Sequence, residues 1–93
     1  MQIRYYIDPV TDLPHLYNHE VSEQEVEDIL ARPLQDIRGR EESRIALGQT
    51  EEGRYVKVIY VPDPIAESVF VITAYELGAK AKRALRRSRR RKR

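Results

Sequence analysis

Cysteine is absent from the 93-residue sequence, and so is any apolar run long enough to cross a membrane. Without cysteine, the chain has no disulfide bridge, no zinc site built on thiolates and no cysteine nucleophile. A membrane-spanning helix needs about 18 or more consecutive apolar residues, so we expect none. The first residues, MQIRYYIDPV, lack the apolar segment of a secretory signal. We therefore expect a cytoplasmic protein with no membrane association.

The composition is that of one small domain. Hydrophobic residues make up 41% of the chain and charged residues 34%, which is enough apolar material for one modest core. We assign residues 1–85 to this domain and residues 86–93, RRSRRRKR, to a basic tail. The tail has no apolar side chain to bury, so we expect it to be disordered when free.

The formal net charge of +2 hides a separation of charge along the chain. Residues 1–79 contain 7 Lys and Arg against 15 Asp and Glu, a net charge of −8. Residues 80–93 contain 10 Lys and Arg and no acidic residue. This asymmetry indicates a polyanionic partner, and we favour nucleic acid. A tail that only improves solubility, or that binds an acidic protein, is the alternative interpretation.

One helix has a strong start signal. Ser22 and Glu25 have the spacing of a capping box, in which each side chain accepts a hydrogen bond from the other residue's backbone amide. The apolar residues Val26, Ile29 and Leu30 follow at helical spacing. Pro33 disfavours helical backbone at the residue before it. These signals predict a helix over about residues 22–31.

The remaining segments show the alternation that is typical of strands. We expect strands at residues 2–7, 43–50, 54–61 and 68–75, a possible further strand at 34–37, and a second helix at Leu77–Leu85. The order indicates an α+β fold, with an antiparallel sheet of about four strands and the helices packed on one face.

Alternation along the strands also predicts the two faces of the sheet. The expected core face carries Val56, Val58, Tyr60, Phe70, Ile72 and Ala74, together with Ile45 and Leu47. The expected opposite face carries Arg44, Tyr55, Lys57, Ile59, Val71, Thr73 and Tyr75. This second face is either a half-solvated surface or a surface that contacts RNA through its cations and rings.

Several segments resemble the motifs of BrnT-type toxins and of the related DUF4258 group. Asn18-His19-Glu20-Val21-Ser22 resembles the KHGVS box of the toxins, and residues 43–50 resemble their strand with an ER…G pattern. Gly53-Arg54 with the following VKVIYV, and Val71–Tyr75, resemble their last two strands. The motifs occur in the family's order over roughly residues 5–85.

This resemblance implies a RelE-like fold and the toxin of a type II toxin–antitoxin pair. Such toxins are similar to small metal-independent endoribonucleases that cut mRNA, on or off the ribosome, and they bind an antitoxin protein. Asn18, Glu20 and Tyr75 stand where the family has Lys, Gly and Arg. A non-catalytic RNA- or ribosome-binding module of the same fold, or an interaction protein that binds an acidic partner, is the alternative function.

Cleavage of RNA without a metal needs a base for the 2′-hydroxyl proton, a cation for the phosphorane and an acid for the 5′-oxygen. The catalytic candidates are Arg44, Arg54 and Lys57 as cations, with Lys57 also the candidate base, and Tyr75 as the acid or as a stacking ring. The candidate nucleic-acid contacts are His19, Tyr55, Arg83, Arg86, Arg87, Arg89, Arg90 and Arg91.

His15 and His19 are four residues apart, a spacing that suits zinc if the segment is helical. Pro14 and the absence of cysteine or a third histidine argue against such a site. We therefore expect no metal and no cofactor, and we interpret His19 as a structural hydrogen-bonding group or an RNA contact.

Overall fold

The computed structural model describes residues 2–63 and 67–91. Its elements are β1 (Gln2–Tyr5), the 3-10 helix η1 (His15–His19), α1 (Glu23–Ala31), β2 (Gln35–Arg38), β3 (Arg44–Gln49), β4 (Tyr55–Asp63), β5 (Ser68–Glu76) and α2 (Ala79–Arg91). The α+β class predicted from the sequence is confirmed. Within the described residues, no helix is long and apolar enough to cross a membrane.

The sheet is mixed and has five strands, in the order β1-β5-β4-β3-β2. Strands β2 to β5 pair antiparallel, as consecutive short connections require. Strand β1 lies parallel to β5 at the other edge, and from β1 the chain passes through η1 and α1, which crosses one face of the sheet, to β2. The expectation of about four antiparallel strands is therefore wrong in the number of strands and in the direction of β1, whereas the antiparallel pairing of the other strands is confirmed.

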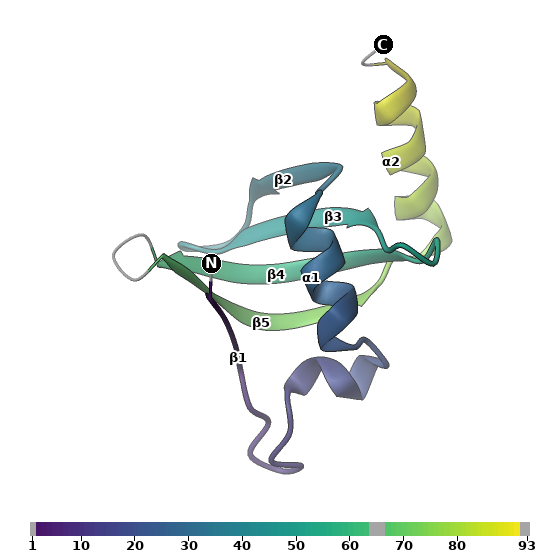
Figure 1. Ribbon diagram of the computed structural model, residues 1–93. Helices are drawn as coiled ribbons and strands as arrows, with labels where there is room; N and C mark the ends of the chain where they lie inside the picture. The colour runs from purple at the N-terminus through teal and green to yellow at the C-terminus, as the bar shows by residue number, and fades with distance from the viewer. Residues whose placement is uncertain (1, 64–66, 92–93) are drawn as a thin grey trace.

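Helix α1 covers one face of the sheet (Figure 1), and its predicted capping box is confirmed. The Glu25 amide donates to Ser22 Oγ at 3.1 Å, and the Ser22 amide donates to Glu25 Oε1 at 3.0 Å. Val26 and Ile29 of α1 are fully buried against the sheet. The buried apolar cluster is Leu16, Val21, Val26, Ile29, Ala46, Val56, Val58, Tyr60, Val69, Val71 and Ala74.

The residues of strand β3 that face α1 are its small ones, and its large apolar residues point away from α1. Ala46 and Gly48 are buried, whereas Ile45 and Leu47 lie on the opposite face, which we call the open face. The helix lies so close that a Cβ added at Gly48 would come within 3.2 Å of Ile29 Cδ1. The expectation that the larger Ile45 and Leu47 face the core is wrong, because the close approach of α1 selects for small side chains.

A β-bulge in the β4–β5 ladder changes the phase of β5. The register shifts between Ile59 and Tyr60, so that Ile59 pairs with Thr73 and Tyr60 pairs with Val71. Ala74 therefore faces the core as predicted, but Val71 is also buried and Ile72 is 36% exposed. Strict alternation placed Phe70 and Ile72 in the core and Val71 outside, and these three assignments are wrong since a bulge inserts one unpaired residue.

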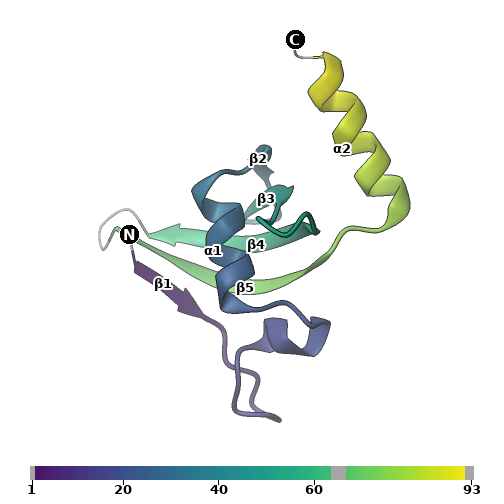
Figure 2. The same ribbon diagram turned by 45° about the vertical axis from the view of Figure 1, so that its right-hand side comes forward.

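The basic C-terminal segment is helical where the sequence predicted disorder. Helix α2 begins at Ala79 and continues through Arg91, while residues 92 and 93 of the predicted tail lie outside the described residues. Lys, Arg and Ala are good helix formers, so the helix propagates into the basic run. In two views α2 stands clear of α1 and to one side of the sheet (Figures 1 and 2).

Candidate functional site

Arg44 lies on the other face of the sheet from Lys57 and Tyr75. Its partner across the ladder is Tyr60, which faces α1, whereas Lys57 pairs with Tyr75 on the open face. The expectation that Arg44 joins Lys57 and Tyr75 on one face is therefore wrong. The cause is the alternation along β3: Ala46 faces the core, and Arg44, two residues before it, lies on the same face.

Arg44 is also bound to a carboxylate. Its Nε donates to Asp36 Oδ1 at 2.8 Å, and Tyr60 Oη donates to Asp36 Oδ2 at 2.6 Å. Burial, followed by this hydrogen bond, raises the pKa of Tyr60 to about 12. The three side chains link β2, β3 and β4, so Arg44 has a structural role in this arrangement.

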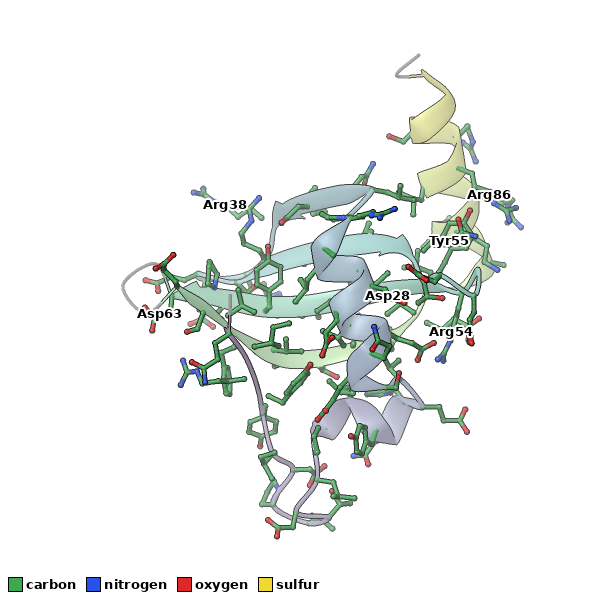
Figure 3. The ribbon with its side chains drawn as sticks, in the orientation of Figure 1. Asp28, Arg38, Arg54, Tyr55, Asp63 and Arg86 are labelled. Atoms are coloured by element: carbon green, nitrogen blue, oxygen red, sulfur yellow. The ribbon has the colours of Figure 1, made fainter. Side chains whose placement is uncertain are left out.

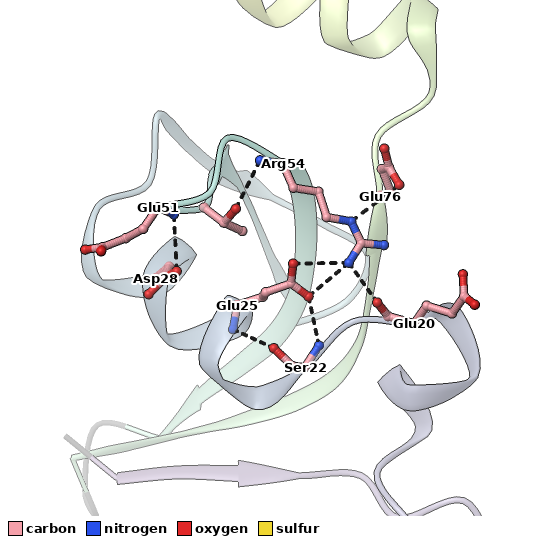
Figure 4. Close-up of polar contacts among 8 residues, drawn as sticks. Glu20, Ser22, Glu25, Asp28, Glu51, Arg54 and Glu76 are labelled. Carbon is pink, nitrogen blue, oxygen red and sulfur yellow. Dashed lines mark hydrogen bonds and ion pairs between the residues drawn. The ribbon is translucent and has the colours of Figure 1, made fainter.

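Arg54 is held by the start of α1 (Figure 4). Its Nη1 donates to both oxygens of Glu25, at 2.9 and 3.1 Å, and to the Glu20 carbonyl at 2.7 Å. Its Nε lies 3.4 Å from Glu76 Oε1. With two carboxylates beside it, the Arg54 guanidinium connects the β3–β4 hairpin to the capping box and contributes little net positive potential for a phosphate.

Three predicted site residues do come together on and beside the open face. The Lys57 Nζ lies 5.3 Å from the centroid of the Tyr75 ring, and the Tyr75 ring centroid is 5.7 Å from that of His19. His19 in turn lies 5.4 Å from the ring of His15, edge to face. We call Lys57, Tyr75, His19 and His15 the histidine cluster. It joins the consecutive strands β4 and β5 to η1, which is far from them in sequence.

Behind the cluster lies an Asp–His pair that the sequence did not reveal. His15 Nδ1 is 3.0 Å from Asp8 Oδ2, and Asn18 Nδ2 donates to the same oxygen at 2.9 Å. Asp8 Oδ1 accepts from the Val10 amide at 2.8 Å. These bonds, with that of Val10 the strongest cause, lower the pKa of Asp8. Asp8-Pro9 reads as a strand end in the sequence, and only the folded loop brings the carboxylate to His15.

A second group of cations and rings lies where the basic helix α2 contacts Tyr55. Lys82 Nζ and Arg86 Cζ lie 5.6 and 5.3 Å from the centroid of the Tyr55 ring, and Figure 3 shows Arg86 beside Tyr55. Leu85 of α2 is buried, and Gln35 Nε2 of β2 donates to Ser88 Oγ at 2.9 Å, so α2 is anchored to the sheet. The candidate contacts Arg83, Arg86 and Arg87 are exposed on α2, and Arg89, Arg90 and Arg91 continue the same helix.

Tyr55 and Lys57 are two residues apart on β4, so both side chains lie on the open face. Cations and rings therefore follow one another from α2 through Tyr55 and Lys57 to the histidine cluster. On the side covered by α1, a hollow of about 430 Å³ contains three acidic side chains and one basic one; it is lined by Gln24, Glu27, Asp28, Ala31, Arg32, Gln49, Thr50 and Glu51. A polyanion is attracted to the first side and repelled by the second.

Among the described residues, no group of three or more His, Cys, Asp or Glu side chains is arranged to hold a metal ion. No family model, curated protein or solved structure matches this chain. The histidine cluster and α2 therefore provide the chemistry from which a function can be inferred.

Proposed function

We propose that this protein binds RNA and cleaves it without a metal ion, as the toxin of a type II toxin–antitoxin pair with a RelE-like, BrnT-type fold. The observation that carries the proposal is the contact of Lys57, Tyr75 and His19 at the end of a surface that begins with the basic helix α2. The sheet with one covering helix supports the fold assignment. The site of action is the cytoplasm, where mRNA and an antitoxin partner are found.

RNA binding follows from the arrangement of charge and rings. The exposed cations of α2 contact phosphates, and the rings of Tyr55 and Tyr75 provide faces on which unpaired bases stack. The acidic residues beside α1 limit binding to the open face, because a phosphate placed near them is repelled.

Cleavage follows from the proton-carrying groups beside Lys57. The Lys57 ammonium stabilises the charge that develops on the phosphorane, and His19 lies within the same cluster as a proton donor or acceptor. Arg44 and Arg54 have no part in this chemistry, because carboxylates engage both guanidinium groups.

The test is cleavage of a single-stranded RNA by the purified full chain in the presence of EDTA. We expect products with 2′,3′-cyclic phosphate ends, and no cleavage of an otherwise identical strand with a 2′-deoxy nucleotide at the scissile position. Lys57→Ala should reduce the rate by about 10²-fold or more, as loss of a transition-state donor does. Arg38→Ala, which removes an exposed cation from the edge strand β2, is the matched control and should leave the rate unchanged.

A non-catalytic RNA-binding module is the second candidate, and one observation favours it. Of the cations proposed for catalysis, only Lys57 lies in the histidine cluster. Salt-dependent RNA binding without any cleavage, and without growth arrest on expression in the absence of an antitoxin, would establish this second function and contradict the first.

A further inference from the structure

The histidine cluster contains a group suited to be the base that takes the 2′-hydroxyl proton. His15 Nδ1 is bound to the Asp8 carboxylate, which also accepts from the Asn18 side chain and the Val10 backbone amide, and the His15 side chain is still 34% exposed. Its ring meets those of His19 and Tyr6, at 5.4 and 6.1 Å between centroids. The imidazole is thus held from one side and accessible from the other.

The contacts of Asp8 determine which nitrogen of His15 carries the proton. An ionised carboxylate only accepts hydrogen bonds, so His15 Nδ1 must donate to Asp8 Oδ2. The Asn18 amide also donates to Asp8 Oδ2, at 2.9 Å. Its nitrogen lies 3.4 Å from His15 Nδ1, farther than Asp8 Oδ2 does, so Asp8 is the stronger partner of His15 Nδ1. In the neutral ring, Nε2 therefore has the free lone pair and can take up a proton.

We propose that His15 is the general base of RNA cleavage, that His19 in its protonated form is the general acid, and that Asp8 is a positioning residue for His15. This inference rests on the proposed ribonuclease function. His15 Nε2 takes the 2′-hydroxyl proton as the 2′-oxygen bonds to phosphorus. The bond from phosphorus to the 5′-oxygen breaks, and that oxygen takes the proton of His19. The step leaves a 2′,3′-cyclic phosphate and a 5′-hydroxyl, with no change in total charge.

The pair Asp8→Asn and Thr11→Ala tests the positioning role. An Asn at position 8 can still accept from the Val10 amide through its oxygen, in the place of Asp8 Oδ1. Its NH₂ group then takes the place of Asp8 Oδ2 and donates to His15 Nδ1, so the proton of the neutral ring must lie on Nε2. A ring with this tautomer cannot act as the base, and we expect kcat to fall by about 10²-fold or more. Thr11→Ala removes a hydrogen bond to the Leu13 amide in the same loop and should leave kcat unchanged.

Further measurements on His15 separate catalysis from folding. The ¹⁵N shifts of His15 in the RNA-free protein should show a protonated Nδ1 in the neutral ring of the unsubstituted chain and a protonated Nε2 in Asp8→Asn. His15→Ala should lose cleavage while remaining folded and keeping its RNA affinity, and added imidazole should restore part of the rate. The acidic limb of the pH–kcat profile, which reports the base, should disappear in His15→Ala.

The outcomes distinguish the inference from the function on which it rests. If the unsubstituted chain cleaves no RNA, the ribonuclease function is contradicted and the base role with it. If the chain cleaves RNA but His15→Ala or Asp8→Asn cleaves equally fast, or imidazole fails to rescue a folded His15→Ala, the role of His15 alone is overturned. Equal loss of kcat in Thr11→Ala would assign the effect to the loop and also overturn it.

Discussion

At the scale of single residues, the nearest carboxylate decides what a cation can do. Arg44 and Lys57 lie on strands and Arg54 directly precedes β4, and by sequence each of the three is a reasonable phosphate contact. In the structure both arginines are bound to carboxylates, whereas Lys57 lies over the Tyr75 ring. Lys57 is therefore the one of these three to which we assign a role in the proposed site.

Arg54→Ala should destabilise the protein. Its guanidinium satisfies the Glu20 carbonyl and both oxygens of Glu25, and the substitution leaves these acceptors without that partner. We expect the free energy of unfolding to fall by about 1–3 kcal/mol, measured by urea denaturation. Arg38→Ala should change it by no more than about 0.5 kcal/mol, and equal effects of the two substitutions would contradict the structural role of Arg54.

Asp8 should make stability depend on acidic pH. Its pKa is lowered in the folded state by the Val10 amide first and by His15 second, so the ionised carboxylate favours folding. This contribution is present above the unfolded pKa of about 4 and is lost as the pH falls through the folded value. Melting temperatures should therefore differ between the unsubstituted chain and Asp8→Asn at neutral pH, and the difference should shrink below about pH 4. A constant difference would rule out this linkage.

Tyr75 should act through its ring. The ring contacts both His19 and the Lys57 ammonium, and neither contact uses the hydroxyl. Tyr75→Phe is therefore expected to keep the cleavage rate within about a factor of two to three, while Tyr75→Ala loses the stacking surface for a base and weakens RNA binding by about 1–3 kcal/mol. Rate and affinity measured on the same RNA separate the two effects, and a slow Tyr75→Phe would make the hydroxyl the proton donor.

At the scale of elements, the sequence predicts the existence of strands and helices better than their faces. The capping box of α1 and the alternation along β4 depend on local chemistry, and both are confirmed. The faces of β3 and of part of β5 depend on the close approach of α1 to Gly48 and on the bulge at Ile59 and Tyr60. The bulge has no signal within β5, and the small residues Ala46 and Gly48 of β3 have less weight in a hydrophobic pattern than Ile45 and Leu47, so the pattern alone selected the wrong residues.

The bulge can be tested by a pair of neighbouring substitutions. Val71 is fully buried, whereas Ile72 is 36% exposed, although strict alternation predicts the reverse. Val71→Ala should lower the free energy of unfolding by about 1–3 kcal/mol, and Ile72→Ala should lower it by clearly less, even though it removes more carbon atoms. Thermal or urea unfolding of both variants gives the comparison. A larger loss for Ile72→Ala would place Ile72 in the core and remove the bulge.

At the scale of the whole molecule, the candidate site is an assembly that the sequence predicts only in part. Lys57, Tyr75 and His19 are predicted individually, and the structure brings them together. Asp8 and His15 are seven residues apart, and their contact depends on how the loop between β1 and η1 folds back. The separation of charge is evident from the composition, but its place in the fold follows from the contacts of Lys82 and Arg86 of α2 with Tyr55 on the open face.

The position of the basic charge, and not its amount, should determine RNA binding. Arg83 and Arg87 are exposed on α2, whereas Arg38 and Arg40 are exposed at β2 and just beyond it. The double variants Arg83→Gln/Arg87→Gln and Arg38→Gln/Arg40→Gln remove the same charge from the two places. Because each phosphate contact contributes about 0.7 to the slope of log K against log salt for single strands, the α2 variant should lower the slope by about 1.4. Fluorescence anisotropy with one labelled RNA at several salt concentrations measures both slopes. If the β2 variant lowers the slope equally, binding reflects net charge alone, and α2 is not the surface that RNA contacts.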